Sequence, residues 1–232
     1  MQRNKSRRAL VKSYPTLANA ELHQNEWGQT LHPGTPEDGA SPTVLGEYDA
    51  AFLCRAIDNI ISNEDARMDL FLRWGQMVNG WRAHTRQFGD VTVPLPIFNA
   101  YALLAKLGPE RIAFDNAANT ANVRGFAARR GASVQVVVYR LDEKNAEGNG
   151  DAVGVELTIK GTRGTGGIRF YRIDREHANA YRAWVALGSP PSTPLRMPTS
   201  AQVAEILAKS KPVPETGIVA IENGVARIQL AL

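Results

Sequence analysis

The sequence predicts an α+β protein: a helical N-terminal half, then an antiparallel meander, two helices and a C-terminal β-hairpin. Apolar residues recur at helical spacing through much of 47–131, and the apolar period falls from near 3.6 to 2 after Gly131. Near the C-terminus, Asn223-Gly224 separates two β-branched segments, and this pair favours a two-residue hairpin turn. We therefore expect a single globular domain over residues 47–232, helical over 47–131 and β-rich over 132–232.

The first expected helices lie between residues 52 and 81. Residues 52–61 place their apolar side chains at three-and-four spacing, which makes one apolar face. Ser62 suits a helix N-cap, since an acid follows three residues later. Residues 70–81 then continue the helical period.

Two further helices are expected before the change of period. Pro96 suits the first turn of a helix, and Gly108, followed by proline, suits its end. Residues 110–130 are expected to form a helix that stops at Gly131.

Residues 133–141, 152–160 and 168–173 are expected to be the strands of the meander. The first is β-branched and the second alternates apolar and polar side chains. Helices near 174–187 and 199–210 follow, and the second opens on a threonine N-cap.

The first 46 residues are predicted to be a basic flexible arm and a Gly/Pro-rich linker, because residues 28–46 have too few apolar side chains to fold alone. The whole chain has 27 Lys and Arg against 23 Asp and Glu, a net charge of +4. Without the first twelve residues these counts are 22 and 23. A compact basic run before a near-neutral body favours phosphate binding. The basic residues of the arm are Arg3, Lys5, Arg7, Arg8 and Lys12.

Charge also divides the rest of the chain. Residues 13–123 hold 7 basic and 13 acidic side chains, whereas residues 124–182 hold 11 and 7. The basic part could bind nucleic-acid backbone, or it could meet the acidic part of another copy in a head-to-tail assembly. The arginines expected to contact phosphate there are Arg124, Arg129, Arg130, Arg163, Arg169 and Arg172.

A glycine-rich segment spans residues 160–167. Its backbone N–H groups could cradle a phosphate, with Arg163 beside it, or it could be a plain hairpin loop. It lacks the spacing of a nucleotide-binding P-loop, and no helix is expected to follow it.

Neither a metal site nor a cofactor motif is recognisable. The histidines lack metal-ligand spacing, and Cys54 lies within an apolar helical pattern that indicates a buried thiol. The single cysteine excludes an internal disulfide, and neither a membrane-spanning stretch nor a secretion signal is expected from the sequence. A cytoplasmic or virion location is therefore expected, with a mitochondrial presequence as the alternative reading of the basic N-terminus.

These patterns favour a non-enzymatic structural protein that binds RNA or DNA backbone and self-assembles, as viral coat and nucleocapsid proteins do. The arm and the arginines would neutralise phosphates without reading sequence. An accessory or regulatory DNA-binding protein of a phage, plasmid or bacterium is the first alternative. An enzyme with its active site at the glycine-rich loop is the second, since catalytic groups can converge from distant positions.

Overall fold

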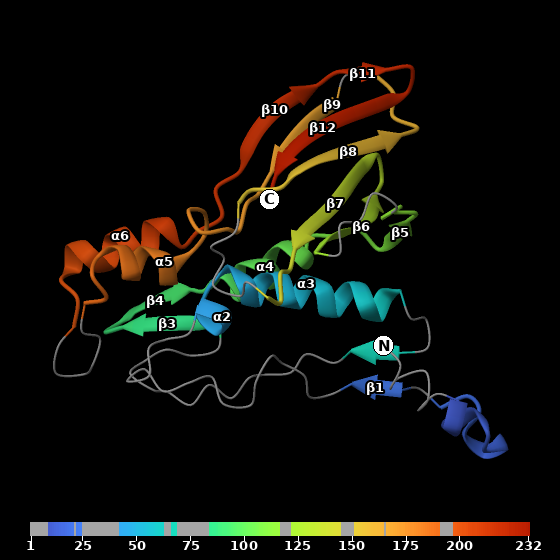
Figure 1. Ribbon diagram of the computed structural model, residues 1–232, viewed down its shortest axis with the longest axis horizontal. Helices are drawn as coiled ribbons and strands as arrows, with labels where there is room; N and C mark the ends of the chain where they lie inside the picture. Colours follow the sequence, from blue (N-terminus) through green and yellow to red (C-terminus); the bar gives the residue numbers. More distant parts are fainter. Residues whose placement is uncertain are drawn as a thin grey trace.

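The computed structural model describes most of the chain, with its backbone alone at residues 22–24, 42 and 66–68 (Figure 1). The expected helix over 70–81 and four arm residues, Arg3, Lys5, Arg7 and Arg8, lie outside the described residues. The described ranges are 9–20, 22–24, 42–62, 66–68, 84–116, 122–144, 151–164, 166–190 and 197–232.

The N-terminal part contains a β–α–β unit. After a 3-10 turn (Pro15–Leu17), strand β1 (Leu22–Gln24) is followed by helices α2 (Pro42–Leu45) and α3 (Glu47–Ile61) and by strand β2 (Ala66–Met68). The two strands pair in parallel, with Leu22 opposite Ala66. Parallel neighbours need such a crossover, because the chain must return to the starting end of the sheet before the second strand begins.

Helix α3 follows from the apolar spacing of its sequence. Two acids in its first turn, Glu47 and Asp49, suit the positive end of the helix dipole. The expected N-cap Ser62 is instead the C-cap of this helix. Its backbone N–H donates to the Asp58 carbonyl, so the helix that was expected to begin there ends there.

A short hairpin and a helix come next. Strands β3 (Thr85–Phe88) and β4 (Val91–Pro94) pair antiparallel, and helix α4 (Pro96–Leu104) follows at once. Pro96 occupies the first helical position, as predicted. There it lacks only an N–H that has no partner within the helix.

The expected helix over 110–130 is wrong. Strands β5 (Glu110–Ile112), β6 (Val123–Arg130) and β7 (Ser133–Arg140) form an antiparallel sheet in the order β5-β6-β7. Alanine and arginine favour helices, but pairing with the β-branched β7 overrides that preference. Gly131 has a φ of 59° because it turns the β6–β7 hairpin.

The predicted meander is also wrong, although each of its three expected strands overlaps an observed one: β7, β8 (Gly154–Lys160) or β9 (Gly166–Phe170). Strand β8 pairs with β12 (Val225–Ala231), and β9 pairs with β10 (Glu215–Val219). Strand β11 (Ile221–Glu222) completes the β11-β12-β8 sheet. The sheet partners are therefore distant in sequence, and local alternation cannot reveal them.

The C-terminal hairpin turn and the helix expected over 199–210 agree with the sequence, whereas the helix expected near 174–187 begins only at Ala180. Asn223 and Gly224 have φ angles of 51° and 78°, so the turn needs the left-handed backbone that this pair tolerates. Helices α5 (Ala180–Ala186) and α6 (Ser200–Lys209) lie between the β9 and β10 strands. Thr199 caps α6 in a reciprocal capping box with Gln202.

Two apolar clusters among the described residues meet at helices α3 and α4. The larger one joins α2, α3 and α4 to the β3–β4 hairpin and to α5 and α6, around Leu53, Leu95 and Ile206. The smaller one joins an adjacent face of α3 to β6 and β7, around Phe126 and Tyr139. Ile57 and Leu104 pack against both clusters.

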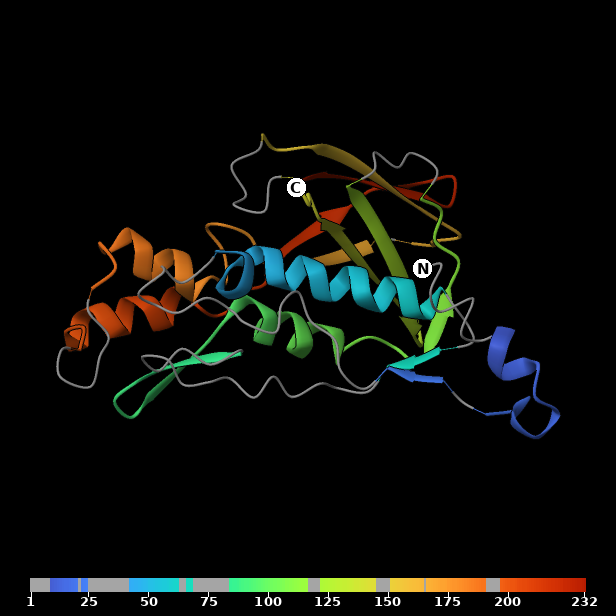
Figure 2. The same ribbon diagram turned by 60° about the horizontal axis from the view of Figure 1, so that its bottom comes forward.

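The elements form a helical layer beneath a group of strands. In Figure 1, α3 and α4 lie between the parallel β1–β2 pair below and the antiparallel strands β6 to β12 above. Helices α5 and α6 and the β3–β4 hairpin gather at one end of α3, and the turned view keeps them together (Figure 2).

Candidate active site

The carboxyl ends of the parallel strands β1 and β2 mark one candidate position for a ligand site. Ligands of α/β units bind beyond the carboxyl ends of parallel strands, since chain segments leave the sheet there and supply side chains. In the sequence, Glu26 comes two residues after the end of β1 and Asp69 directly follows β2. Both acids lie outside the described residues.

Helix α3 begins on the side toward which β1 and β2 point (Figure 1). Its first residue, Glu47, makes a two-pronged ion pair with Arg182 of α5. The Arg182 Nη2 donates to Glu47 Oε1 at 2.6 Å, and Nε lies 3.1 Å from Oε2. Both side chains are less than a fifth exposed. A fork-to-carboxylate pair of this kind fixes orientation as well as distance.

Asn179 completes this contact. Its Nδ2 donates to Glu47 Oε2 at 2.9 Å and to the Asp174 carbonyl at 2.8 Å. Its Oδ1 accepts the Arg182 backbone N–H and so caps helix α5. Its own backbone N–H donates to the Lys209 carbonyl at the end of α6. One buried residue, through its side-chain amide and its backbone N–H, thus joins α3, α5 and α6.

The turn before Asn179 is tightly held. Asp174 Oδ1 accepts the backbone N–H of Glu176 and of His177 and faces His177 Nδ1 at 2.8 Å. Ala178 has a left-handed φ of 54°, an uncommon conformation for a residue with a side chain. The Asn99 amide on α4 donates to the Ala178 carbonyl and to the Ser210 carbonyl.

A second polar cluster lies near the other end of α3. Asp58 is 2% exposed, and its Oδ2 accepts from Arg124 Nε at 2.8 Å and from the Tyr139 hydroxyl at 2.6 Å. Burial, with the Asp58 hydrogen bond adding to it, raises the pKa of the Tyr139 phenol. The same carboxylate raises the pKa of Arg124 through its hydrogen bond. These contacts attach α3 to β6 and β7.

A fully buried arginine occupies strand β3. The Arg86 guanidinium lies over the Phe88 ring, 4.7 Å from its centroid. Burial lowers the pKa of Arg86 to about 10.

The arginines expected to contact phosphate are in several cases held by acids. Arg124 pairs with Asp58, Arg129 with Glu110, and Arg172 with Glu215 at 3.0 Å. Arg130 donates to the Leu107 carbonyl. The remaining predicted residues that the structure describes are exposed: Lys12, Arg163 and Arg169.

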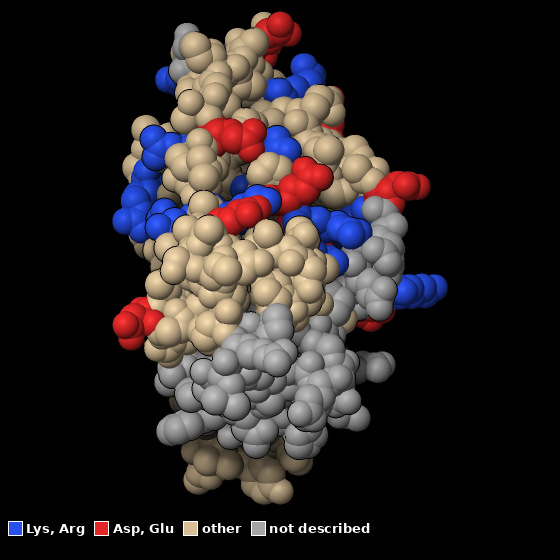
Figure 3. Space-filling model, turned by 90° about the vertical axis from the view of Figure 1, so that its left-hand side faces the viewer, with Lys and Arg blue, Asp and Glu red and all other residues tan. Residues whose placement is uncertain are grey.

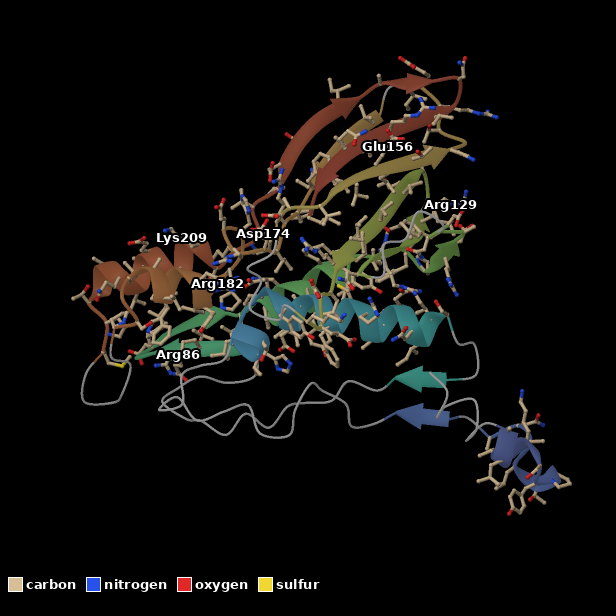
Figure 4. All side chains as sticks on the ribbon, viewed as in Figure 1. Arg86, Arg129, Glu156, Asp174, Arg182 and Lys209 are labelled. Atoms are coloured by element: carbon tan, nitrogen blue, oxygen red, sulfur yellow. The ribbon has the colours of Figure 1, made fainter. Side chains whose placement is uncertain are left out.

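The molecular surface at the α5–α6 end carries charges of both signs. In Figure 3, basic and acidic side chains of the described residues lie intermixed across the middle of this face. Figure 4 places Arg182, Asp174 and Lys209 at this end, whereas Arg129 lies at the opposite side of the molecule.

Among the described residues, no group of three or more His, Cys, Asp or Glu side chains is placed to hold a metal ion. The described helices include none long and apolar enough to cross a membrane. Cys54 is buried, and burial raises the pKa of its thiol to about 12, with Asp58 adding to the shift.

The sequence reasoning missed the two clusters on α3. One signal was available: Asp58 stands four residues after Cys54 and one after Ile57, on the apolar face of the helix. A charge at such a position needs a buried partner. Its partners are 66 and 81 residues away, and no local pattern connects them. Glu47 looked like an ordinary acid of a first helical turn.

The fold and the acids that follow its parallel strands are typical of an α/β enzyme rather than of a coat protein. The family model "Glycosyl hydrolases family 39" matches residues 3–227. The chain therefore belongs to glycosyl hydrolase family 39.

Solved and curated relatives agree with this assignment. A monomeric β-xylosidase from Caulobacter crescentus CB15 superposes with a TM-score of 0.68 at 16% identity, over 97% of this chain and 45% of that one. Another solved family 39 β-xylosidase from Caulobacter crescentus gives 0.63 at 17% identity, over 97% and 47%. A curated β-xylosidase from Caldicellulosiruptor saccharolyticus is 23% identical over 190 residues, which are 79% of this chain and 36% of that protein. The chain thus spans less than half the length of these relatives.

Family membership corrects the predicted fold class and function. The fold is that of a family 39 glycosyl hydrolase and not the predicted helical-N-terminal α+β arrangement. The inferred non-enzymatic, self-assembling coat or nucleocapsid protein is wrong, because the family is one of enzymes. RNA or DNA as partner is wrong for the same reason, and so is the DNA-binding alternative. A basic tail indicates attraction to anions, but it determines neither the fold nor the function of the rest of the chain.

The other expectations stay predictions. They are the boundary between arm and domain at residue 46 and the cytoplasmic or virion location. Val44 and Leu45, which precede that boundary, are buried in the larger apolar cluster.

Proposed function

We propose that this protein contributes to the hydrolysis of β-linked xylosides, with Glu26 as one of the two catalytic carboxylates. The observation that carries the proposal is the match of the family model across residues 3–227. The activity by which these relatives are named, β-xylosidase, supplies the substrate class.

The chemistry requires acids at a particular place. Glycosidases cleave the glycosidic bond with a pair of carboxyl groups: one protonates the departing oxygen, and the other attacks the sugar carbon or activates a water molecule. Glu26 follows the carboxyl end of a parallel strand, where α/β enzymes carry their catalytic side chains. Asp69 follows the neighbouring strand and is the next acid to test.

The direct experiment compares Glu26→Gln with Glu21→Gln. Glu21 directly precedes β1, so the pair places the same change at opposite ends of one strand. The assay is release of p-nitrophenol from p-nitrophenyl β-D-xyloside by the full chain. We expect Glu26→Gln to lower kcat by about a thousandfold or more, because an amide can neither donate nor accept the proton nor attack. Glu21→Gln should retain activity.

If both variants lost activity equally and circular dichroism showed that they were unfolded, the cause would be a structural effect at β1 instead. Full activity of Glu26→Gln would remove Glu26 from the reaction and direct the search to Asp69. A wild-type chain without turnover would contradict the proposed activity.

A further inference from the structure

Strand β10 offers an open edge to other molecules. Among the strands that the structure describes, it pairs with β9 alone. Its first four residues, 215–218, are all exposed, and Ile218 is 80% exposed. In Figure 1, β10 lies outermost among the C-terminal strands. Its second edge therefore presents backbone N–H and C=O groups that another strand can bind.

This edge lacks the features that normally prevent strands of different molecules from pairing, namely charged side chains and prolines. Strand β8 has such protection, because Glu156 and Lys160 are exposed along it. Residues 216–219 of β10 contain neither a charge nor a proline. An exposed apolar side chain on an edge of this kind favours pairing between molecules.

We infer that β10 pairs antiparallel with β10 of a second copy of this chain, about a two-fold axis at Gly217. Because Gly217 is the middle residue of Glu215–Val219, this register pairs every residue of both strands. It joins the two β9–β10 sheets into one sheet across the dimer. The inference concerns association and is independent of the proposed xyloside hydrolysis.

The side chains of the exposed face suit this register. Residues directly opposite each other on paired strands share a face, so Ile218 lies opposite Thr216 of the second copy. The two Ile218 side chains are then diagonal neighbours, within reach of each other. Within its own sheet, Ile218 lies opposite Gly167, which has no side chain to cover it. The pairing thus covers an apolar side chain that its own sheet leaves exposed.

The charges on β9 and β10 also permit a second copy. Glu215, the charged residue of β10, lies opposite Val219 of the second copy and already pairs with Arg172 at 3.0 Å. Arg169, which is opposite Thr216 within the sheet, lies three strand spacings and two residues from its counterpart, a distance of about 16 Å. That distance exceeds the screening length of about 8–10 Å at moderate ionic strength.

The size of the interface sets its expected strength. Interfaces that bury less than about 1,200 Å² are typical of weak and transient complexes, and five residues from each strand form a small interface. We therefore expect a monomer and a dimer in equilibrium. More than half of the solved relative described as monomeric lies outside the match, so its state does not decide that of this chain.

Sedimentation velocity of the full chain tests the association, over about a hundredfold range of protein concentration. We expect the wild type to shift from monomer toward dimer as the concentration rises. Ile218→Lys should weaken dimerisation at least about tenfold, because it places two positive charges as diagonal neighbours at the centre of the pair. Val185→Lys is the matched control and should dimerise as the wild type does, because it adds the same charge at an exposed valine of α5.

Two further measurements keep the test decisive. Thr216→Lys places its charge opposite Ile218 of the second copy, so it replaces Ile218→Lys if circular dichroism shows that variant to be unfolded. Hydrogen exchange locates the interface: the amides of residues 215–219 should exchange more slowly at the highest wild-type concentration than at the lowest. In either lysine variant of β10 this difference should disappear.

A wild type that stays monomeric over the whole range would overturn the inference. So would a dimer that the β10 variants leave intact, because another surface would then form it. Equal weakening by Val185→Lys would have the same consequence, since added charge alone would explain the effect. Exchange at residues 215–219 that does not depend on concentration would also overturn it. The xyloside assays test the proposed function separately from all of these outcomes.

Discussion

At the residue scale, Asp58 is a buried acid whose two strand partners are distant in sequence. Its side chain holds Arg124 and Tyr139, from two strands, against one helix. Removing one member of such a cluster lowers the free energy of unfolding by more than the intact cluster contributes to it, because the remaining polar groups stay buried without their partner.

We therefore expect Asp58→Ala to lower the free energy of unfolding by about 2–4 kcal/mol. Urea denaturation followed by circular dichroism measures the change. Glu215→Ala is the matched control, because it breaks an ion pair with Arg172 in which both side chains are about half exposed. A loss no larger for Asp58→Ala than for this control would contradict the buried role.

Cys54 gives a prediction that depends on pH. Burial raises the pKa of its thiol from 9.0 to about 12. The fraction of Cys54 present as the reactive thiolate is therefore much smaller in the folded protein than in the unfolded chain. Iodoacetamide at pH 8.5 should alkylate the native protein at least about a hundredfold more slowly than the protein in guanidinium chloride. Similar rates in both states would show that the thiol is accessible.

The sign of the accompanying stability change follows from linkage. Above pH 9 the unfolded thiol loses its proton while the folded thiol keeps it, so unfolding is favoured as the pH rises toward 12. The contribution of the protonated Cys54 thiol to stability is fully present below pH 9 and is lost as the pH rises from 9 to about 12. Cys54→Ala should make the fall in stability over this range less steep than in the wild type.

At the scale of elements, two glycines explain how close β6 lies to its neighbours. A Cβ at Gly108 would come within 2.0 Å of the Arg129 carbonyl oxygen, and one at Gly125 would meet Phe114 and the Val137 carbonyl at 2.6 Å. Backbone atoms of a paired sheet cannot move aside cheaply.

Gly108→Ala and Gly125→Ala should each lower the free energy of unfolding by about 1–3 kcal/mol. Gly154→Ala, at the start of β8, is the control, since no heavy atom lies within 4 Å of its added Cβ. Chemical denaturation of the three variants gives the comparison. Equal stability across the three would mean that β6 is less closely packed than described.

The elements also show what the sequence could and could not predict. Helix α4, the capped start of α6 and the Asn223-Gly224 turn follow from local chemistry, namely a proline at the first helical position, a capping box and a left-handed turn. Strand β6 does not follow from it. Its Ala- and Arg-rich sequence favours a helix, and its pairing with β7 decides otherwise.

The candidate site was less predictable than the fold. Glu47 contacts Asn179 and Arg182, which come 132 and 135 positions later in the sequence. Such contacts have no local pattern, and the acids that follow β1 and β2 gain meaning from the parallel pairing of those strands. That pairing joins residues 44 positions apart.

At the scale of the whole molecule, helices α3 and α4 connect two apolar clusters. Ile57 and Leu104 pack against both, so neither cluster can open without exposing surface of the other. We expect tryptophan fluorescence and far-ultraviolet circular dichroism to report one coincident urea transition. Two separate midpoints would show that the clusters unfold as independent units.

The central claim is that this member of glycosyl hydrolase family 39 takes part in cleaving β-xylosides. The measurement that tests it most directly is the release of xylose from β-1,4-xylobiose by the purified full chain, followed by chromatography, with Glu26→Gln beside it. The account predicts xylose release by the wild type and its loss in the variant. No release by a folded wild-type chain, or equal release by both proteins, would contradict it.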